Sequence, residues 1–173
     1  RNPIAGDVSA CVSGFAKHQT LHIFYSDSVD KDLRYATYDG KTFKFEVIDG
    51  NGSAVNKYED PIRVRTASDV SVANACSVSA VGVQVFYRDE SQGILLGAVK
   101  ASNSKEWKYE LVDGDRKTDD RTTGDVAFHL DALFDGKSTI LLYDSVLTIN
   151  QRKEVTSGAI RVAQRIGVSP QGW

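Results

Sequence analysis

Three short runs decide the fold of this chain: Leu21-His-Ile-Phe-Tyr25, Val83-Gln-Val-Phe-Tyr87 and Thr139-Ile-Leu-Leu-Tyr143. Each run ends in a tyrosine that stands 18 positions after the aspartate of an Asp-Val dipeptide, at Asp7, Asp69 and Asp125. A gapless match at three places indicates an internal repeat, with starts 62 and 56 residues apart. Repeats of this kind are typical of solenoids, propellers and arrays.

Each unit continues as a series of short strands. Alternating patterns rich in β-branched and aromatic residues predict strands in the first unit over 8–12, 21–25, 33–38 and 43–48, closed by Asp49-Gly50. The matching strands of the second unit are 70–73, 83–87, 94–99 and 107–112, closed by Asp113-Gly114. No segment has a sustained helical period of apolar residues, so we predict an all-β chain.

Four antiparallel strands joined as a meander form one blade of a β-propeller. We therefore predict about three blades, over residues 7–50, 69–114 and 125–173. A β-sandwich is the alternative, because a count of strands alone does not separate the two architectures. The internal repeat favours the propeller.

The third unit stops before its fourth strand. Its predicted strands are 126–130, 139–143 and 160–163, with an insertion at 148–157, and Trp173 stands where the first two units begin strand four with Phe43 and Trp107. An uncovered strand leaves unpaired backbone groups, and propellers typically close with four to eight blades. We expect a second protein chain or a second copy of this chain to complete the propeller; the alternative is a fragment that closes its edge by local rearrangement.

The composition excludes two classes of partner. A formal net charge of −2 gives no basic face for nucleic acid. The apolar stretches are only strand-sized, so no segment is expected to span a membrane. The sequence opens with Arg1 and lacks a signal-peptide pattern, from which we expect a processed or excised chain.

The two cysteines, Cys11 and Cys76, lie at offsets +4 and +7 from their repeat starts. Odd and even positions of a strand face opposite sides of a sheet. A disulfide requires Cβ atoms that face each other. We therefore expect two buried free thiols.

Few residues suggest metal or catalytic chemistry, and we expect no cofactor. The three histidines, His18, His22 and His129, lack the spacing of a zinc site. The acidic loop over 113–120 has interleaved basic residues, which indicate a solvated loop and not a calcium site. No nucleophile-elbow string Gly-x-Ser-x-Gly occurs.

The strings Leu21-His-Ile-Phe-Tyr-Ser-Asp27, Asp32-Leu-Arg-Tyr-Ala36, Asp39-Gly-Lys-Thr-Phe43 and Phe45-Glu-Val-Ile-Asp-Gly50 resemble repeats of secreted bacterial β-propellers, some of which are sugar-binding lectins. The resemblance implies ligand pockets between adjacent blades, built from aromatic, arginine and acidic side chains. It also implies a secreted or cell-surface location. The matching candidates are Tyr25, Asp27, Arg34, Tyr87, Asp89, Trp107, Arg161 and Trp173.

Three functions are consistent with these observations. The first is an extracellular recognition module that binds carbohydrate, because a sugar presents an apolar face to an aromatic ring and hydroxyls to charged groups. The second is a non-catalytic structural or interaction module of a larger processed protein. The third, a glycosidase-type enzyme fragment, requires a pair of carboxylates at a defined separation, which a sequence does not supply.

Overall fold

A computed structural model describes residues 5–27, 29–50, 70–90, 92–114, 122, 125–152, 154–166 and 173. These residues form eleven strands and one short 3-10 helix, η1 (Ala16–His18). Within this described part of the chain, no helix is long and apolar enough to cross a lipid bilayer.

The strands form three antiparallel sheets, each ordered as the chain runs. The first sheet contains β1 (Ala5–Ser13), β2 (Thr20–Asp27), β3 (Asp32–Tyr38) and β4 (Phe43–Gly50). The second contains β5 (Val70–Ser79), β6 (Gly82–Asp89), β7 (Ile94–Ala101) and β8 (Lys108–Asp113). The third contains β9 (Val126–Phe134), β10 (Ser138–Ile149) and β11 (Val155–Ile166).

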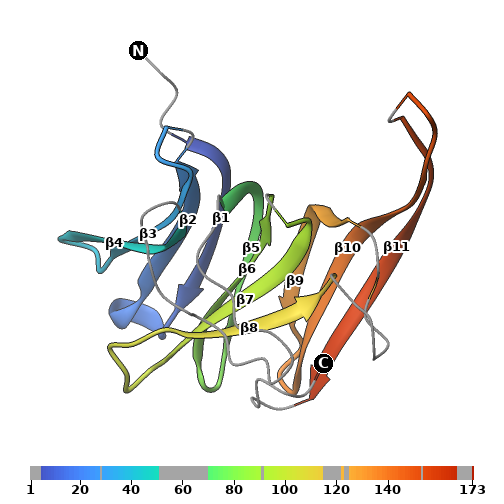
Figure 1. Ribbon diagram of the computed structural model, residues 1–173. Coiled ribbons are helices and arrows are strands. Elements are labelled where there is room, and N and C mark those ends of the chain that lie inside the picture. Colours follow the sequence, from blue (N-terminus) through green and yellow to red (C-terminus); the bar gives the residue numbers. More distant parts are fainter. Residues whose placement is uncertain are drawn as a thin grey trace.

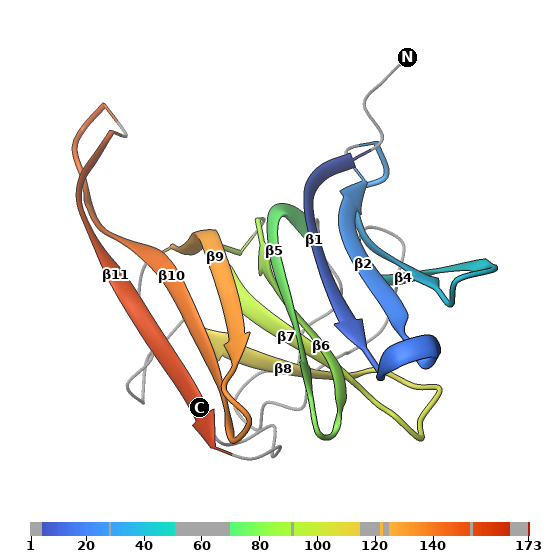
Figure 2. The same cartoon turned by 180° about the vertical axis from the view of Figure 1, so that it is seen from behind.

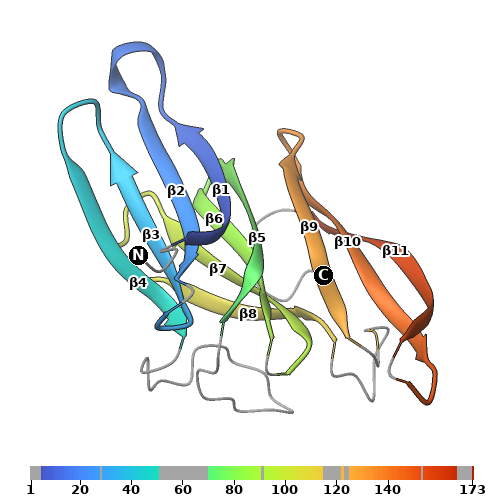
Figure 3. The same cartoon turned by 90° about the horizontal axis from the view of Figure 1, so that it is seen from above.

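The first strands of the three sheets, β1, β5 and β9, lie side by side, and the later strands of each sheet fan outward (Figures 1 and 2). Seen from above, the three sheets lie next to one another in the order of the chain (Figure 3). This is the arrangement of an incomplete β-propeller and not of a β-sandwich, so the predicted fold class is confirmed. We call the sheets blades 1, 2 and 3.

Each blade has two faces with different residues. The Phe face carries Phe24 in blade 1, Phe86 in blade 2 and Leu142 in blade 3, while the Tyr face carries the next residue, Tyr25, Tyr87 or Tyr143. Neighbours along a strand point to opposite sides, which explains why the two sets separate.

Two apolar clusters join the blades, and both combine a Phe face with a Tyr face. In the first, Phe24, Leu33 and Ile48 of blade 1 pack with the Tyr-face residues of blade 2, which include Val85, Tyr87 and Leu96. In the second, Phe86, Leu95 and Val112 of blade 2 pack with Leu141 and Tyr143 of blade 3. We call these contacts junction 1 and junction 2.

A tyrosine hydroxyl crosses each junction to a carboxylate. Tyr87 Oη donates to Asp49 Oδ2 at 2.7 Å, and Tyr143 Oη donates to Asp113 Oδ2 at 2.8 Å. All four side chains are buried. The repeated tyrosine of one blade therefore holds the repeated Asp-Gly end of the blade before it.

The Asp-Val dipeptide of blade 1 is not equivalent to the other two. Val8 pairs with Tyr25, whereas the residues opposite Tyr87 and Tyr143 are Asn74 and Leu130, each five positions after the aspartate of its own dipeptide. The cause is the connection between β1 and β2, which contains η1 and is four residues longer than the turn at 80–81. The tyrosines repeat, but the first dipeptide matches by coincidence; Asp69 lies outside the described residues.

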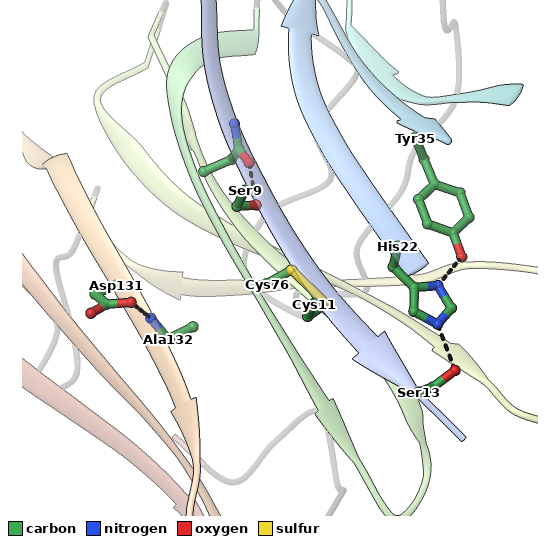
Figure 4. The surroundings of a disulfide bond; sticks show 9 residues. Ser9, Cys11, Ser13, His22, Tyr35, Cys76, Asp131 and Ala132 are labelled. Carbon is green, nitrogen blue, oxygen red and sulfur yellow. Dashed lines mark hydrogen bonds between the residues drawn. A yellow bond between two sulfur atoms is a disulfide. The ribbon is translucent and has the colours of Figure 1, made fainter. Parts of the chain in front are cut away.

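The expectation of free thiols is wrong, because Cys11 of β1 and Cys76 of β5 form a disulfide with a Cα–Cα distance of 6.0 Å (Figure 4). Cys11 pairs with His22 and lies on the Phe face, whereas Cys76 pairs with Val85 and lies on the Tyr face. The cysteines do lie on opposite faces of their sheets. However, these are the faces that meet at junction 1.

The predicted insertion at 148–157 is largely strand. Strand β10 ends at Ile149, and strand β11 begins at Val155. The hairpin that they form projects from blade 3 (Figure 1). Asn150 N donates to Glu154 O at 3.0 Å and closes the turn.

Removal of the disulfide by a Cys11→Ala/Cys76→Ala double substitution is expected to lower the free energy of unfolding by about 4 kcal/mol, because the bridge closes a loop with a sequence separation of 65. Urea unfolding of both proteins measures this. Alkylation of both cysteines in the unreduced native protein would contradict the bridge.

Candidate functional site

A cluster of polar and aromatic side chains lies at the partly exposed edge of junction 1, which we call its rim. Glu46 of β4 accepts two hydrogen bonds at Oε1, from Lys100 Nζ of β7 at 2.7 Å and from Trp107 Nε1 at 3.1 Å. The Lys100 and Glu46 side chains keep 21% and 37% of their surface exposed. An anion, a cation and an indole therefore meet where solvent reaches them.

Aromatic rings form the floor of this cluster. Trp107 meets Tyr35 edge to face at 5.3 Å between ring centroids, and Phe24 at 6.0 Å. Lys100 Nζ lies 5.4 Å from the centroid of the Trp107 ring. The contacts hold the indole in a fixed orientation beside the ion pair.

A chain of hydrogen bonds continues inward from Tyr35. His22 Nδ1 lies 2.6 Å from Tyr35 Oη, and His22 Nε2 lies 2.7 Å from Ser13 Oγ (Figure 4). Burial, and then the positive charge of Lys100, lower the pKa of His22 below its usual value. Burial also raises the pKa of Tyr35, so both groups remain neutral near pH 7.

Junction 2 contains the equivalent residues in a closed arrangement. Arg165 of β11 stands where blade 2 has Lys100, and its Nη1 contacts both carboxylate oxygens of Glu110, at 2.5 and 2.7 Å. Arg165 Nη2 also donates to Gln84 Oε1. The guanidinium is buried and lies 4.6 Å from the centroid of Trp173. The ion pair is thus buried at junction 2, whereas the equivalent pair of Lys100 and Glu46 at junction 1 is partly exposed.

Gly97 explains why Glu110 turns inward. It occupies the position of Tyr35, and a Cβ atom built there would lie only 2.9 Å from Glu110 Oε1 and 3.1 Å from Phe86. The missing side chain thus leaves room for the Glu110 carboxylate. In blade 1 the Tyr35 ring occupies this space, and Glu46 remains at the rim.

Three of the predicted site residues gather on the Tyr face of blade 1. Tyr25 pairs with Arg34 across β2 and β3, and Arg34 Nε lies 3.0 Å from Asp27 Oδ2. The turn amides of Val29 and Asp30, and then the Arg34 guanidinium, hold the pKa of Asp27 below its usual value. Asp27 and Arg34 thus organise the β2–β3 turn.

The other predicted residues are divided between the two junctions. Trp107 lies at junction 1, whereas Trp173 lies at junction 2 and contacts Phe86 edge to face at 5.4 Å. Tyr87 binds Asp49, and Arg161 Nε lies 3.4 Å from Asp113 Oδ2. Asp89 accepts hydrogen bonds from Gln92 in the β6–β7 turn. The structure does not bring the eight candidates together in one pocket.

The sequence prediction missed Glu46 and Lys100. Glu46 and Glu110 share a place in two matching strings, Phe43-Lys-Phe-Glu and Trp107-Lys-Tyr-Glu. Lys100 and Arg165 each stand two positions after an alanine shared by the units, Ala98 and Ala163. These signals were visible, but Tyr38 occupies the corresponding position of blade 1 and breaks the pattern.

Among the described residues, no group of three or more His, Cys, Asp or Glu side chains is placed to hold a metal ion. Most of the acidic loop over 113–120 lies outside the described residues.

No protein-family model and no curated protein matches the sequence. Among solved structures, the chain is similar to a mutant of the lectin from Aleuria aurantia in complex with α-methyl-L-fucoside. The TM-score is 0.52 and the identity 14%, and the match covers 96% of this chain and 50% of that chain. Another structure of this fungal lectin, described as a six-bladed β-propeller with a novel fucose recognition mode, gives a TM-score of 0.48 and 11% identity over 95% and 48% of the two chains.

At these identities the likeness concerns the fold, which is that of an incomplete β-propeller. The chain spans about half the length of the lectin chain that it matches.

The low pKa of His22 has a measurable consequence. The unfolded chain binds a proton there near pH 6.5, more readily than the folded protein, so the free energy of unfolding should fall as the pH drops below about 6.5 and through the folded-state pKa. A His22→Gln substitution, which copies Gln84 of blade 2, is expected to flatten this decline.

Urea unfolding between about pH 7.5 and 5 tests the prediction. His18→Gln is the matched control, because the His18 side chain is exposed. An equal decline in the His22→Gln protein and the unmodified protein would show that His22 is not the cause.

Proposed function

We propose that this chain is a carbohydrate-binding module of the β-propeller type, acting outside the cell in a ring that a partner chain completes. The observation that supports this most is the open rim of junction 1, where Trp107 lies beside Glu46 and Lys100.

The residue types at this rim suit a sugar. The apolar face of a pyranose packs against an aromatic ring. Its hydroxyls accept from an ammonium and donate to a carboxylate, and hydrogen bonds to charged groups are the stronger ones. Lys100 and Glu46 are already oriented by each other, so a sugar would meet a preformed pair.

Junction 2 is expected to bind no sugar. Its ion pair, between Arg165 and Glu110, is buried, whereas the equivalent pair of Lys100 and Glu46 at junction 1 is partly exposed. Removal of one partner of such a buried pair would leave an uncompensated charge and destabilise the packing of blades 2 and 3. The proposal therefore assigns one sugar site to the described part of each chain.

Two further observations support the proposal. The disulfide between Cys11 and Cys76 favours an oxidising compartment, as expected for a secreted or cell-surface protein. The structure of the similar fungal lectin contains α-methyl-L-fucoside (methyl α-L-fucoside). This glycoside is therefore the first probe to try.

A second candidate function is a non-catalytic interaction module. The exposed apolar side chains on blades 1 and 3 favour it, because large exposed apolar patches mark interaction sites.

Lys100→Met is expected to weaken sugar binding at least about tenfold, because it removes a charged donor and keeps the aliphatic stem. Titration calorimetry with methyl α-L-fucoside and a panel of other methyl glycosides measures the affinities. Lys108→Met, at an exposed position of β8, is the control and should bind as the unmodified protein does.

If no glycoside binds, the carbohydrate proposal is wrong and the interaction module is favoured. If a glycoside binds equally well to Lys100→Met, the sugar site is not at junction 1.

A further inference from the structure

The two ends of the arc present the two halves of one interface. Inside the chain, each junction joins a Phe face to a Tyr face. The Tyr face of blade 1 and the Phe face of blade 3 each lack a neighbouring blade in the described structure (Figure 3).

The Phe face of blade 3 exposes side chains whose equivalents are buried elsewhere. Ile160 occupies the position of Leu33 in blade 1 and Leu95 in blade 2; it is 77% exposed, whereas both leucines are 0% exposed. Leu142 and Val162 extend the same apolar surface. We call Leu142, Ile160 and Val162 the blade 3 patch.

The Tyr face of blade 1 shows the matching difference. Tyr25 and Ile23 are half-buried, whereas their equivalents Tyr87 and Val85 are fully buried in junction 1. Val8, which pairs with Tyr25, is 52% exposed. We call Val8, Val12, Ile23 and Tyr25 the blade 1 patch.

The blade 3 patch lies on a Phe face and the blade 1 patch on a Tyr face. They fit head to tail, as Phe face meets Tyr face at both internal junctions. A heterologous contact of this kind forms a ring if the rotation closes. The described residues form three blades, and the chain spans about half of the similar lectin chain, so two copies would supply a full ring.

We propose that the blade 3 patch of one copy packs on the blade 1 patch of a second copy, and that two such contacts close a ring of six blades. This inference rests on the proposal that a partner chain completes the ring. It identifies that partner as a second copy of the same chain. It does not depend on sugar binding, because junction 1 lies within one chain.

Single charges in either patch test the proposal. Val8→Asp and Ile160→Asp place an aspartate in the contact, and both positions are exposed in the isolated chain, so each variant should still fold. Val29→Asp is the matched control, because Val29 is 58% exposed in the β2–β3 turn and outside both patches. Circular dichroism checks folding, and light scattering gives the mass.

The unmodified protein and Val29→Asp are expected at twice the chain mass of 18.9 kDa. Val8→Asp and Ile160→Asp should each raise the dissociation constant of the dimer to at least about 10 times that of the Val29→Asp control. A mixture of the two variants should regain dimers in native mass spectrometry, because one of its two contacts has two intact patches.

Each contrary result overturns the proposal. A monomeric unmodified chain excludes the second copy, and a mass of three or more copies excludes the two-copy ring. Failure of the mixture to form mixed dimers excludes the head-to-tail contact. Sugar binding is scored separately by calorimetry, so a dimer without sugar binding, or sugar binding by a monomer, distinguishes the two proposals.

Discussion

The structure depends on the burial of the Phe face of one blade against the Tyr face of the next. A sheet with two apolar faces must cover both, and stacking unlike faces lets every blade use the same surfaces. The hydrogen bonds from Tyr87 to Asp49 and from Tyr143 to Asp113 fix the position of each blade on the last. The disulfide between Cys11 and Cys76 adds a covalent link at the inner strands of junction 1.

The candidate site follows from a departure from this regular stacking. Both junctions place a glutamate of one blade opposite a basic residue and a tryptophan of the next. Where blade 2 has Gly97, the glutamate folds inward and pairs with a buried arginine. Where blade 1 has Tyr35, the ring occupies that space and the glutamate remains accessible. The residue beside the glutamate, Gly97 or Tyr35, therefore separates a buried ion pair from a partly exposed one.

The fold was predictable because strand periodicity and the repeated tyrosine are local patterns. Contacts between blades were not, since they depend on which faces meet. The cysteines show this: their opposite parity is correct, but parity excludes a bridge only within one sheet. Trp107 was predicted at the site, whereas Lys100 was not, because Tyr38 occupies its position in blade 1 and obscures the correspondence between Lys100 and Arg165.

The most direct test of this account is a double-mutant cycle across junction 1, with Tyr87→Phe and Asp49→Asn combined and alone. Stability is measured by urea unfolding. The stacking predicts a coupling free energy of about 1 kcal/mol or more, because both partners of the hydrogen bond are buried. Tyr143→Phe combined with Asp49→Asn should be additive, since Tyr143 belongs to the other junction. A coupling near zero between Tyr87 and Asp49 would contradict the packing of Phe face on Tyr face.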